Sequence, residues 1–329
     1  MKRRIFGELD GAPVEAVTLE SPEAAVTILS FGCVLQDWRI GGLPVVLGFA
    51  DLPSYLTASR SHGAIVGRVA NRTAGASFEM DGRTYALTAN HGPEKQHHIH
   101  GGATGLGKRN WAVAADPASE SVTLRYRSPD GEEGYPGTVD FTVTYRLDGP
   151  RLVCEMAGLP DRVTPVNLAH HAYFNLGGDG SVQDHVLQVA ADAYTPLRPD
   201  SIPEGTIRPV AGTPFDFRTA RAIGDTALDL NYVLPDGRDP AAPVASAFCP
   251  RSGLRLRVWT DQPGLQVFDA PTMTVAAAGH GGTPYLPFAG LCFEAQHFPD
   301  SLHNPGWPSI LRSPEQPYRQ LYTVEIAPA

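Results

Sequence analysis

The chain has 329 residues, of which 42% are apolar and 19% charged, a composition that supports a large core and excludes a disordered chain. Its 34 glycines and 30 prolines exceed average usage and disfavour long helices. The formal net charge of −9 argues against nucleic-acid binding, because an acidic surface repels phosphate backbones.

Most of the predicted elements are strands. Residues 51–56 are predicted to form a short helix. Residues 77–80 and 83–87 flank Asp81-Gly82, a dipeptide that favours a two-residue turn, so they are predicted to form a hairpin. Residues 218–228 are a second predicted short helix. Apolar and polar residues alternate in the remaining predicted strands, which are 122–126, 138–148, 152–156 and 254–258.

Strands follow strands without intervening helices of about 10–15 residues, a pattern typical of antiparallel sheets rather than of a parallel α/β fold. No segment has the composition of a linker. We therefore expect residues 1–329 to form one all-β domain, a large antiparallel β-sandwich.

The four cysteines, Cys33, Cys154, Cys249 and Cys292, form no C-x-x-C pair, which disfavours zinc-ribbon and thioredoxin-like sites. They are expected to be small buried residues in a reducing compartment. The basic N-terminus begins like a signal peptide, but Gly-Glu-Leu-Asp follows where an apolar stretch is required. No apolar run reaches the roughly 18 residues that span a bilayer. We expect a soluble, cytoplasmic protein that binds no membrane.

Histidines cluster at His97, His98 and His100, and again at His170 and His171. On a strand, His98 and His100 would share one face, and a third metal ligand could come from His170 or His171. No neighbouring carboxylate completes a familiar ligand spacing. Structural, hydrogen-bonded histidines are therefore the favoured interpretation, and a metal site is the alternative.

Two acids are embedded in apolar surroundings. Glu294 follows an apolar run and precedes a turn; partial desolvation there would raise its pKa toward neutrality, as suits a general base. The alternative is a glutamate that only pairs with an arginine. Asp229 lies between leucines, and because burying it unpaired would be costly, it should meet a partner or a polar ligand. Arg68 and Asn71 add hydrogen-bond donors beside a predicted strand.

Five motifs, in this order, resemble those of the aldose 1-epimerase (galactose mutarotase) family. Residues 67–72 resemble its Gly-Arg-x-x-Asn-Arg motif, and residues 98–102 resemble its Leu-His-Gly-Gly motif. Residues 166–176 resemble Asn-Leu-x-x-His-x-Tyr-Phe-Asn-Leu, which aligns His171 with the histidine of that motif. Residues 229–234 resemble Asp-x-x-Phe/Tyr-x-Leu, and residues 294–300 resemble Glu-x-Gln-x-Phe-Pro-Asp. The resemblance covers about residues 30–325.

The resemblance implies a galactose mutarotase-like supersandwich, a site with no metal or cofactor, and an isomerase that is a monomer or a homodimer. Its reaction would interconvert the α and β anomers of a free aldose such as glucose or galactose. Glu294 would be the general base and His171 the general acid, which suits ring opening by deprotonation of the anomeric hydroxyl and protonation of the ring oxygen. The residues implied to hold sugar hydroxyls are Arg68, Asn71, His100 and Asp229.

The sequence departs from the family pattern at three places. His97 replaces a frequent Asn, Leu230 a frequent His, and residues 268–270 a frequent Tyr-x-Gly-Asn. These departures leave the preferred sugar open, and residues 268–282 are expected to reshape one wall of the pocket.

Two rival functions remain open at this point. A non-catalytic carbohydrate-binding protein would not need both Glu294 and His171. A hexose-6-phosphate 1-epimerase would need clustered lysines or arginines around the phosphate.

Overall fold

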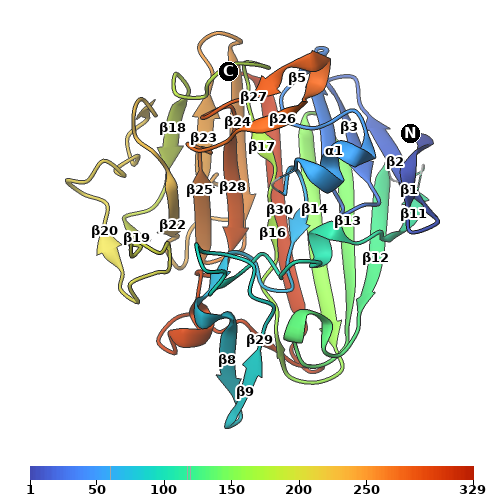
Figure 1. Ribbon diagram of the computed structural model, residues 1–329. Helices are drawn as coiled ribbons and strands as arrows, with labels where there is room; N and C mark the ends of the chain where they lie inside the picture. The colour runs from blue at the N-terminus through green and yellow to red at the C-terminus, as the bar shows by residue number, and fades with distance from the viewer. Residues whose placement is uncertain (60, 117, 119) are drawn as a thin grey trace.

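The computed structural model describes residues 1–59, 61–116, 118 and 120–329. Antiparallel strands make up most of it, and a long twisted sheet forms one layer (Figure 1). In spatial order, the strands of this sheet are β11 (Ala112–Asp116), β12 (Ser121–Ser128), β13 (Val139–Asp148), β14 (Arg151–Pro160), β30 (Tyr318–Pro328), β24 (Leu254–Thr260), β23 (Ala245–Phe248), β18 (Val186–Val189) and β21 (Arg221–Ala222).

Two further antiparallel sheets pack against the long sheet. The first, called the site sheet below, has the order β17 (Tyr173–Phe174), β28 (Leu291–Gln296), β25 (Gly264–Phe268), β22 (Asp229–Val233), β19 (Ala193–Thr195) and β20 (Arg208–Pro209). The second is N-terminal, with the order β1 (Lys2–Leu9), β2 (Ala12–Glu20), β3 (Ala24–Leu29), β4 (Leu35–Ile40) and β5 (Leu43–Pro44).

Short pairs of strands connect and cover these layers. They are β6 (Ile65–Val66) with β16 (Ala169–His170), β7 (Arg72–Thr73) with β10 (His98–Ile99), β8 (Ser77–Met80) with β9 (Arg83–Ala86), β15 (Thr164–Pro165) with β29 (Leu311–Arg312), and β26 (Val275–Ala278) with β27 (Pro284–Tyr285). The helical segments are α1 (Leu52–Thr57) and the 3₁₀ turns η1 (Ala74–Ala76), η2 (Leu106–Lys108), η3 (Glu132–Gly134), η4 (His280–Gly282) and η5 (Ser301–His303). Among the described residues, no helix has the length and apolar character needed to cross a membrane.

The all-β antiparallel sandwich expected from the sequence is confirmed, and so are most of its elements. The four alternating segments are β12, β13, β14 and β24. The hairpin β8–β9 turns at Asp81 and Gly82 with positive φ values of 52° and 71°, as a two-residue turn of this type requires. The helix α1 begins after Asp51, whose side chain accepts a hydrogen bond from the Ser54 amide.

The helix predicted at residues 218–228 is wrong. Arg221 and Ala222 instead form β21 and pair with Leu187 and Val186 of β18. Gly224 then adopts a φ of +63°, a left-handed conformation that a right-handed α-helix cannot contain. An edge position on the long sheet has therefore overridden the weak helical propensity of this segment.

The core lies between the long sheet and the other two, and it fixes which side chains the site sheet turns outward. On β28, Leu291, Phe293 and Ala295 are buried in this core. Because neighbouring residues on a strand point to opposite faces, Cys292 and Glu294 face the other side. The same alternation holds on β22 and β25. The residues that it buries in the core are Leu230, Tyr232, Leu265 and Val267. The residues that it turns outward are Asp229, Asn231, Gln266 and Phe268.

The turn after β10 depends on a glycine. Gly101 has a φ of +80°, and a Cβ built on it would lie 1.7 Å from the carbonyl oxygen of Gly67. Only a residue without a side chain fits there, which gives a physical reason for the first glycine of the His-Gly-Gly motif.

We predict that Gly101→Ala lowers the free energy of unfolding by about 3–5 kcal/mol, because it adds a backbone clash to left-handed strain. Gly82→Ala is the matched control, since Gly82 has a φ of +71° but no atom within 4 Å of its Cβ position. The control should lose only about 1–2 kcal/mol. Urea titration of both variants measures the difference, and equal losses would contradict this account of the turn.

Candidate active site

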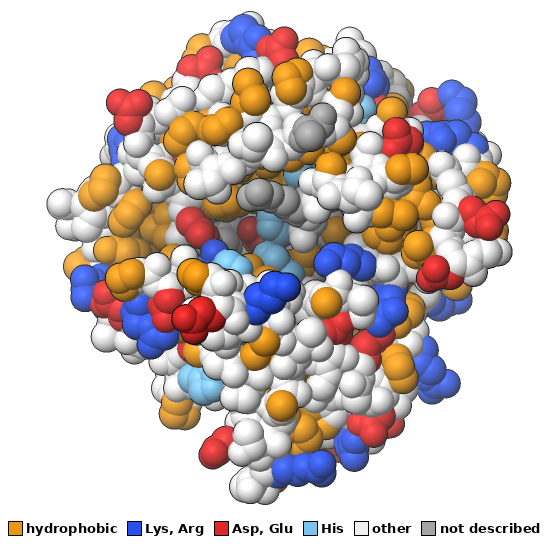
Figure 2. All heavy atoms as spheres, viewed as in Figure 1, with side chains coloured by type: hydrophobic (Ala, Val, Ile, Leu, Met, Phe, Trp, Pro, Cys, Tyr) orange, Lys and Arg blue, Asp and Glu red, His pale blue; other side chains and the backbone are white. Residues whose placement is uncertain are grey.

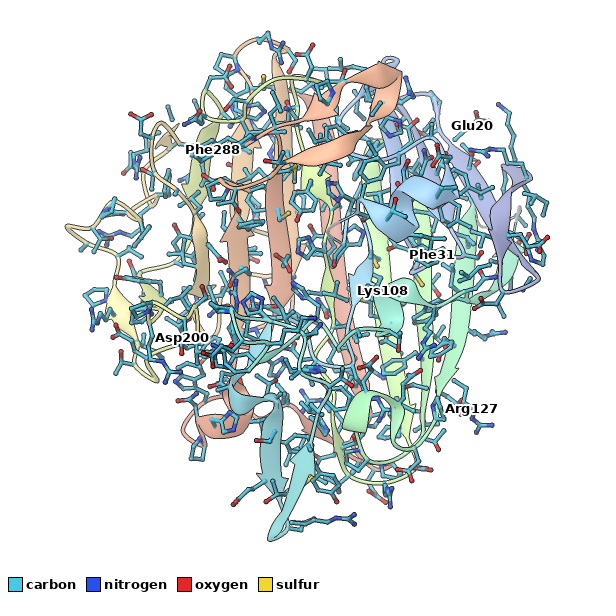
Figure 3. All side chains as sticks on the ribbon, in the orientation of Figure 1. Glu20, Phe31, Lys108, Arg127, Asp200 and Phe288 are labelled. Atoms are coloured by element: carbon cyan, nitrogen blue, oxygen red, sulfur yellow. The ribbon has the colours of Figure 1, made fainter. Side chains whose placement is uncertain are left out.

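A cavity of about 540 Å³ opens over the outward face of the site sheet. Figure 2 shows the hollow near the middle of this face, with acidic, basic and histidine side chains gathered inside it. Figure 3 shows the loops that carry Lys108 and Asp200 on either side of the lower end of β28 in this view. The lining residues are Ser61, Asn71, Arg72, His91, Ile99, His100, His171, Tyr173, Ser201, Asp229, Gln266, Phe268, Pro271, Thr272 and Glu294.

Glu294 and His171 face each other at the floor of this cavity. The Oε1 of Glu294 lies 3.7 Å from the Nε2 of His171, and both residues are buried. Glu294 projects from β28, while His171 follows β16 and is held by backbone hydrogen bonds to Ala64 and Gly63. Among the described residues, Oε2 of Glu294 is buried and has no hydrogen-bond partner.

The surroundings shift the pKa values of these two groups in opposite directions. Burial, followed by the negative charge of Asp229, raises the pKa of Glu294 to about 8, although Arg72 opposes the shift. Burial lowers the pKa of His171 to about 4, although its own backbone carbonyl and Asp229 oppose the shift. At neutral pH the pair therefore holds one exchangeable proton, and it contains one group able to donate and one able to accept.

His100 reaches the cavity through an unusual turn. Asn71 and His100 both have left-handed backbones, with φ values of 59° and 53°. The amide of His100 donates to the carbonyl of Asn71, and the amide of Asn71 donates to Nδ1 of His100. Burial lowers the pKa of His100 well below its usual value, and His171 and Arg72 add to the shift. The ring is therefore neutral with its proton on Nε2, so it offers the cavity a hydrogen-bond donor.

Asp229 and Arg72 form a second polar group beside the catalytic candidates. Arg72 donates from Nη2 to Oδ2 of Asp229 at 3.1 Å and from Nε to Nε2 of His91 at 3.1 Å. Gln266 donates to the other oxygen of Asp229 at 2.6 Å. The Asp229 side chain remains 34% exposed, so its carboxylate is fixed in position and still open to hydroxyl groups of a ligand.

Arg68 does not line the cavity, unlike Asn71, His100, Asp229, His171 and Glu294. It is 2% exposed, and its guanidinium donates to the Ser128 hydroxyl and to the carbonyls of Pro129, Pro136 and Gly137. The guanidinium also lies 5.6 Å from the centre of the Tyr135 ring. It therefore holds the loop between β12 and β13 in place, and the structure puts Arg68 outside the cavity lining, where the sequence predicted a sugar-binding role.

The histidine cluster divides into structural and cavity-lining members. His98 bonds to the Thr88 carbonyl and the Tyr135 hydroxyl, and His170 lies between the Tyr145 and Tyr322 rings. The expectation that His98 and His100 share a face fails because β10 ends at Ile99 and His100 has a left-handed backbone.

His100, His171 and Glu294 are instead the residues that meet, with one potential ligand atom from each within 4.8 Å of the others. A metal ion bound through Nε2 of His100 would require a proton on Nδ1, where the Asn71 amide already donates. The tautomer therefore fits hydrogen bonding to a ligand better than metal coordination.

One of the three departures from the family pattern reaches the cavity. Leu230 is buried on the core side of β22, and His97 accepts a hydrogen bond from Gly75 outside the lining. Phe268 lines the cavity, as do Pro271 and Thr272 just beyond it. The expectation that residues 268–282 reshape one wall therefore concerns the start of this segment, where the lining residues lie.

Several lining residues were not assigned from the sequence. Arg72 is the last residue of the early motif at residues 67–72, but nothing in that motif says which of its two arginines points into the cavity. Tyr173 lies two residues beyond His171, and the two rings are 5.0 Å apart. Gln266 belongs to no motif, and its only signal is a polar side chain between the buried Leu265 and Val267.

Comparison with known proteins identifies the family. The family model described as aldose 1-epimerase matches residues 15–324. The chain belongs to the aldose 1-epimerase family. It is 39% identical to galactose mutarotase of Mus musculus over 96% of this chain and 95% of that protein. It is 34% identical to aldose 1-epimerase of Escherichia coli over 91% of this chain and 90% of that protein. The protein is accordingly an isomerase.

Solved structures of the family have the same fold. An aldose epimerase homologue from C. elegans superposes with a TM-score of 0.89 at 27% identity, over 96% of this chain and 99% of that one. Galactose 1-epimerase from Lactobacillus acidophilus superposes with a TM-score of 0.86 at 26% identity, over 99% and 98% of the two chains. The sandwich expected from the sequence is therefore the mutarotase-like one.

We predict that replacing Arg72 and replacing Arg68, the two arginines of the early family motif, have different effects. Arg72→Met should lower kcat/KM by about 10- to 100-fold, because it removes a charged hydrogen-bonding group from the cavity. Arg68→Met should instead lower the free energy of unfolding by about 2–5 kcal/mol, because it leaves buried carbonyls without donors. Sugar titrations and urea unfolding distinguish the two. A stable Arg68→Met protein with a raised KM would show that Arg68 takes part in sugar binding.

Proposed function

We propose that this protein is an aldose 1-epimerase in which Glu294 and His171 are the acid–base pair. The observation that carries the proposal is the buried 3.7 Å approach of these two groups, with their pKa values displaced in opposite directions. Neighbouring titratable groups whose pKa values are shifted in opposite directions are typical of acid–base catalysis. The membership of the chain in the aldose 1-epimerase family supports the same reaction.

The reaction needs two proton transfers at one sugar ring. One group takes the proton from the anomeric O1 while the other gives a proton to the ring oxygen, and the bond between C1 and that oxygen breaks. Rotation about C1–C2 in the open aldehyde then presents the other face of C1 to the returning hydroxyl. Because the reaction runs in both directions, each member of the pair must act as acid in one direction and as base in the other.

The sugar would be held by the remaining polar groups of the cavity. His100 offers its Nε2–H, Asp229 offers carboxylate oxygens, and Asn71 and Arg72 lie beside them. Charge-assisted hydrogen bonds from hydroxyl groups to Asp229 would contribute about 1.5–3 kcal/mol each. The Tyr173 and Phe268 rings supply an apolar surface for the sugar face.

The rival functions receive less support from this site. A binding protein has no need of a buried acid and base 3.7 Å apart. A sugar phosphate would need unpaired cations, but the cation among the described lining residues is Arg72, which already donates to Asp229 and His91. We therefore propose unphosphorylated aldoses such as glucose and galactose as substrates.

We also propose that residues 1–329 act as one domain, as a monomer or homodimer, in the cytoplasm. The four cysteines are all buried and free in the structure, which suits a reducing compartment.

Polarimetry tests the function directly. Freshly dissolved α-anomers of glucose, galactose, xylose and arabinose, together with glucose 6-phosphate, should be followed with and without the protein. Faster relaxation with a free aldose is expected. If none of the free sugars is accelerated, the proposal fails, and acceleration of the phosphate alone would favour the phosphate-specific enzyme.

We predict that Glu294→Gln and His171→Asn each lower kcat by about 10²- to 10⁴-fold, because each removes a general acid–base group while keeping a similar shape. Sugar binding, measured by calorimetry, should persist in both. His170→Asn is the matched control: it changes the neighbouring buried histidine, which does not line the cavity. Full activity in His171→Asn together with loss in His170→Asn would show that His170, and not His171, is the histidine of the pair.

We predict a broad, bell-shaped pH profile of kcat/KM, which rises around the pKa of about 4 of His171 and falls around the pKa of about 8 of Glu294. Below the lower value both groups are protonated and no base remains; above the upper value both are deprotonated and no acid remains. Initial rates from pH 3 to 10, corrected for spontaneous mutarotation, measure the profile. A kcat/KM that keeps rising above pH 9 would contradict the requirement that Glu294 and His171 together hold one exchangeable proton.

We predict that metal removal leaves the rate unchanged, because the Asn71 amide fixes His100 in a tautomer that disfavours coordination. The measurement is polarimetry after exhaustive dialysis against EDTA. Loss of activity that a divalent ion restores would replace the acid–base mechanism by a metal-assisted one.

A further inference from the structure

The strand β28 contacts both nitrogens of the His171 ring. Sγ of Cys292 lies 3.7 Å from Nδ1, and Oε1 of Glu294 lies 3.7 Å from Nε2. Cys292 and Glu294 are two positions apart on one strand, so their side chains leave the same face about 6–7 Å apart. The imidazole therefore lies along the strand, with each nitrogen next to a different side chain.

The other contacts of His171 do not determine which ring edge faces the cavity. Backbone hydrogen bonds to Ala64 and Gly63 fix the main chain. The rings of His100 and Tyr173, at 5.1 and 5.0 Å, restrict the tilt of the imidazole. A half-turn about the Cβ–Cγ bond would preserve the ring plane but exchange each nitrogen with a carbon. A polar partner at Nδ1 opposes that half-turn.

Cys292 is itself rigidly held. It is 0% exposed and lies between Tyr173 of β17 and Phe268 of β25 in the sheet register. Burial raises the pKa of its thiol well above the usual value, and the nearby Glu294, Asp269 and Asp229 carboxyls add to the shift. The group is therefore a neutral thiol, suited to hydrogen bonding and not to nucleophilic attack.

The proposed reaction also determines which atom carries the fixed proton. In that reaction, Nε2 of His171 exchanges a proton with the sugar, so a proton that stays on the ring throughout belongs on Nδ1. The hydrogen bond at one ring nitrogen sets the protonation of the other. Sulfur is a weak acceptor, so it can hold an Nδ1–H without stabilising the imidazolium as strongly as a carboxylate would.

We propose that Cys292 is a positioning residue, whose Sγ accepts a hydrogen bond from Nδ1 of His171 and keeps Nε2 directed at the sugar and at Glu294. Its kinetic consequence rests on the acid–base function proposed above. Its structural consequence, an Nδ1-protonated neutral ring, does not.

The experiment compares Cys292→Ala with Cys292→Ser, and uses Cys249→Ala as the control. Cys249 is also buried and free, but it does not line the cavity. Cys292→Ala should lower kcat by about three- to tenfold with KM unchanged, because the sugar contacts remain. Cys292→Ser keeps a hydrogen-bonding group and should stay within about twofold of the original kcat. Cys249→Ala should change neither parameter.

Nitrogen-15 NMR of the imidazoles, assigned with His171→Asn, provides a readout independent of activity. His171 should be Nδ1-protonated in the original protein and in Cys292→Ser, and a mixture of tautomers in Cys292→Ala. The positioning role is overturned if the tautomer is unchanged in Cys292→Ala, if serine fails to rescue kcat, or if Cys249→Ala loses as much activity. If the original protein shows no mutarotation, the acid–base function fails, while the tautomer comparison still decides the role of Cys292.

Discussion

The two-residue period of the strands in the site sheet is the constraint on which the cavity depends. Each strand that buries Leu230, Val267 or Phe293 in the core must present its alternate residues to the other face. Those residues include Asp229, Gln266 and Glu294. Gln266 is paired with Glu294 across β25 and β28, and it donates a hydrogen bond to Asp229, which lies diagonally across from it on β22. A one-residue slip of any of these strands would bury its polar group in the core and remove it from the cavity.

The same arrangement accounts for the electrostatics. The sheet packed on its core buries Glu294 at the floor of the cavity, and this burial, followed by the negative charge of Asp229, raises the pKa of Glu294. Arg72 and Gln266 each donate a hydrogen bond to one oxygen of Asp229, which holds that side chain in place. Burial also raises the pKa of Asp269 to about 6, with a further contribution from Asp229. Asp229 thus contributes to the raised pKa values of both Glu294 and Asp269.

The sequence predicted the sandwich because alternation over residues such as Val139, Phe141 and Val143 is visible along a single strand. It also placed Glu294 and His171, because their motifs are compact. It could not separate Arg68 from Arg72, since their orientations depend on the left-handed backbone at Asn71 and on a loop about 60 residues away that receives Arg68. Gln266 could not be predicted as a cavity residue for a similar reason. Its position in the cavity depends on the pairing of β25 with β22 and β28.

The floor and the wall of the cavity belong to different kinds of structure. Glu294, Gln266 and Asp229 are held by a continuous hydrogen-bonded sheet, whereas Pro271, Thr272 and Ser201 come from connections between strands. Loops tolerate substitution and insertion far better than paired strands with a buried face. The wall can therefore diverge while the floor is kept: replacements in the wall would alter which sugar fits, while the paired strands beneath keep Asp229, Gln266 and Glu294 at a fixed spacing.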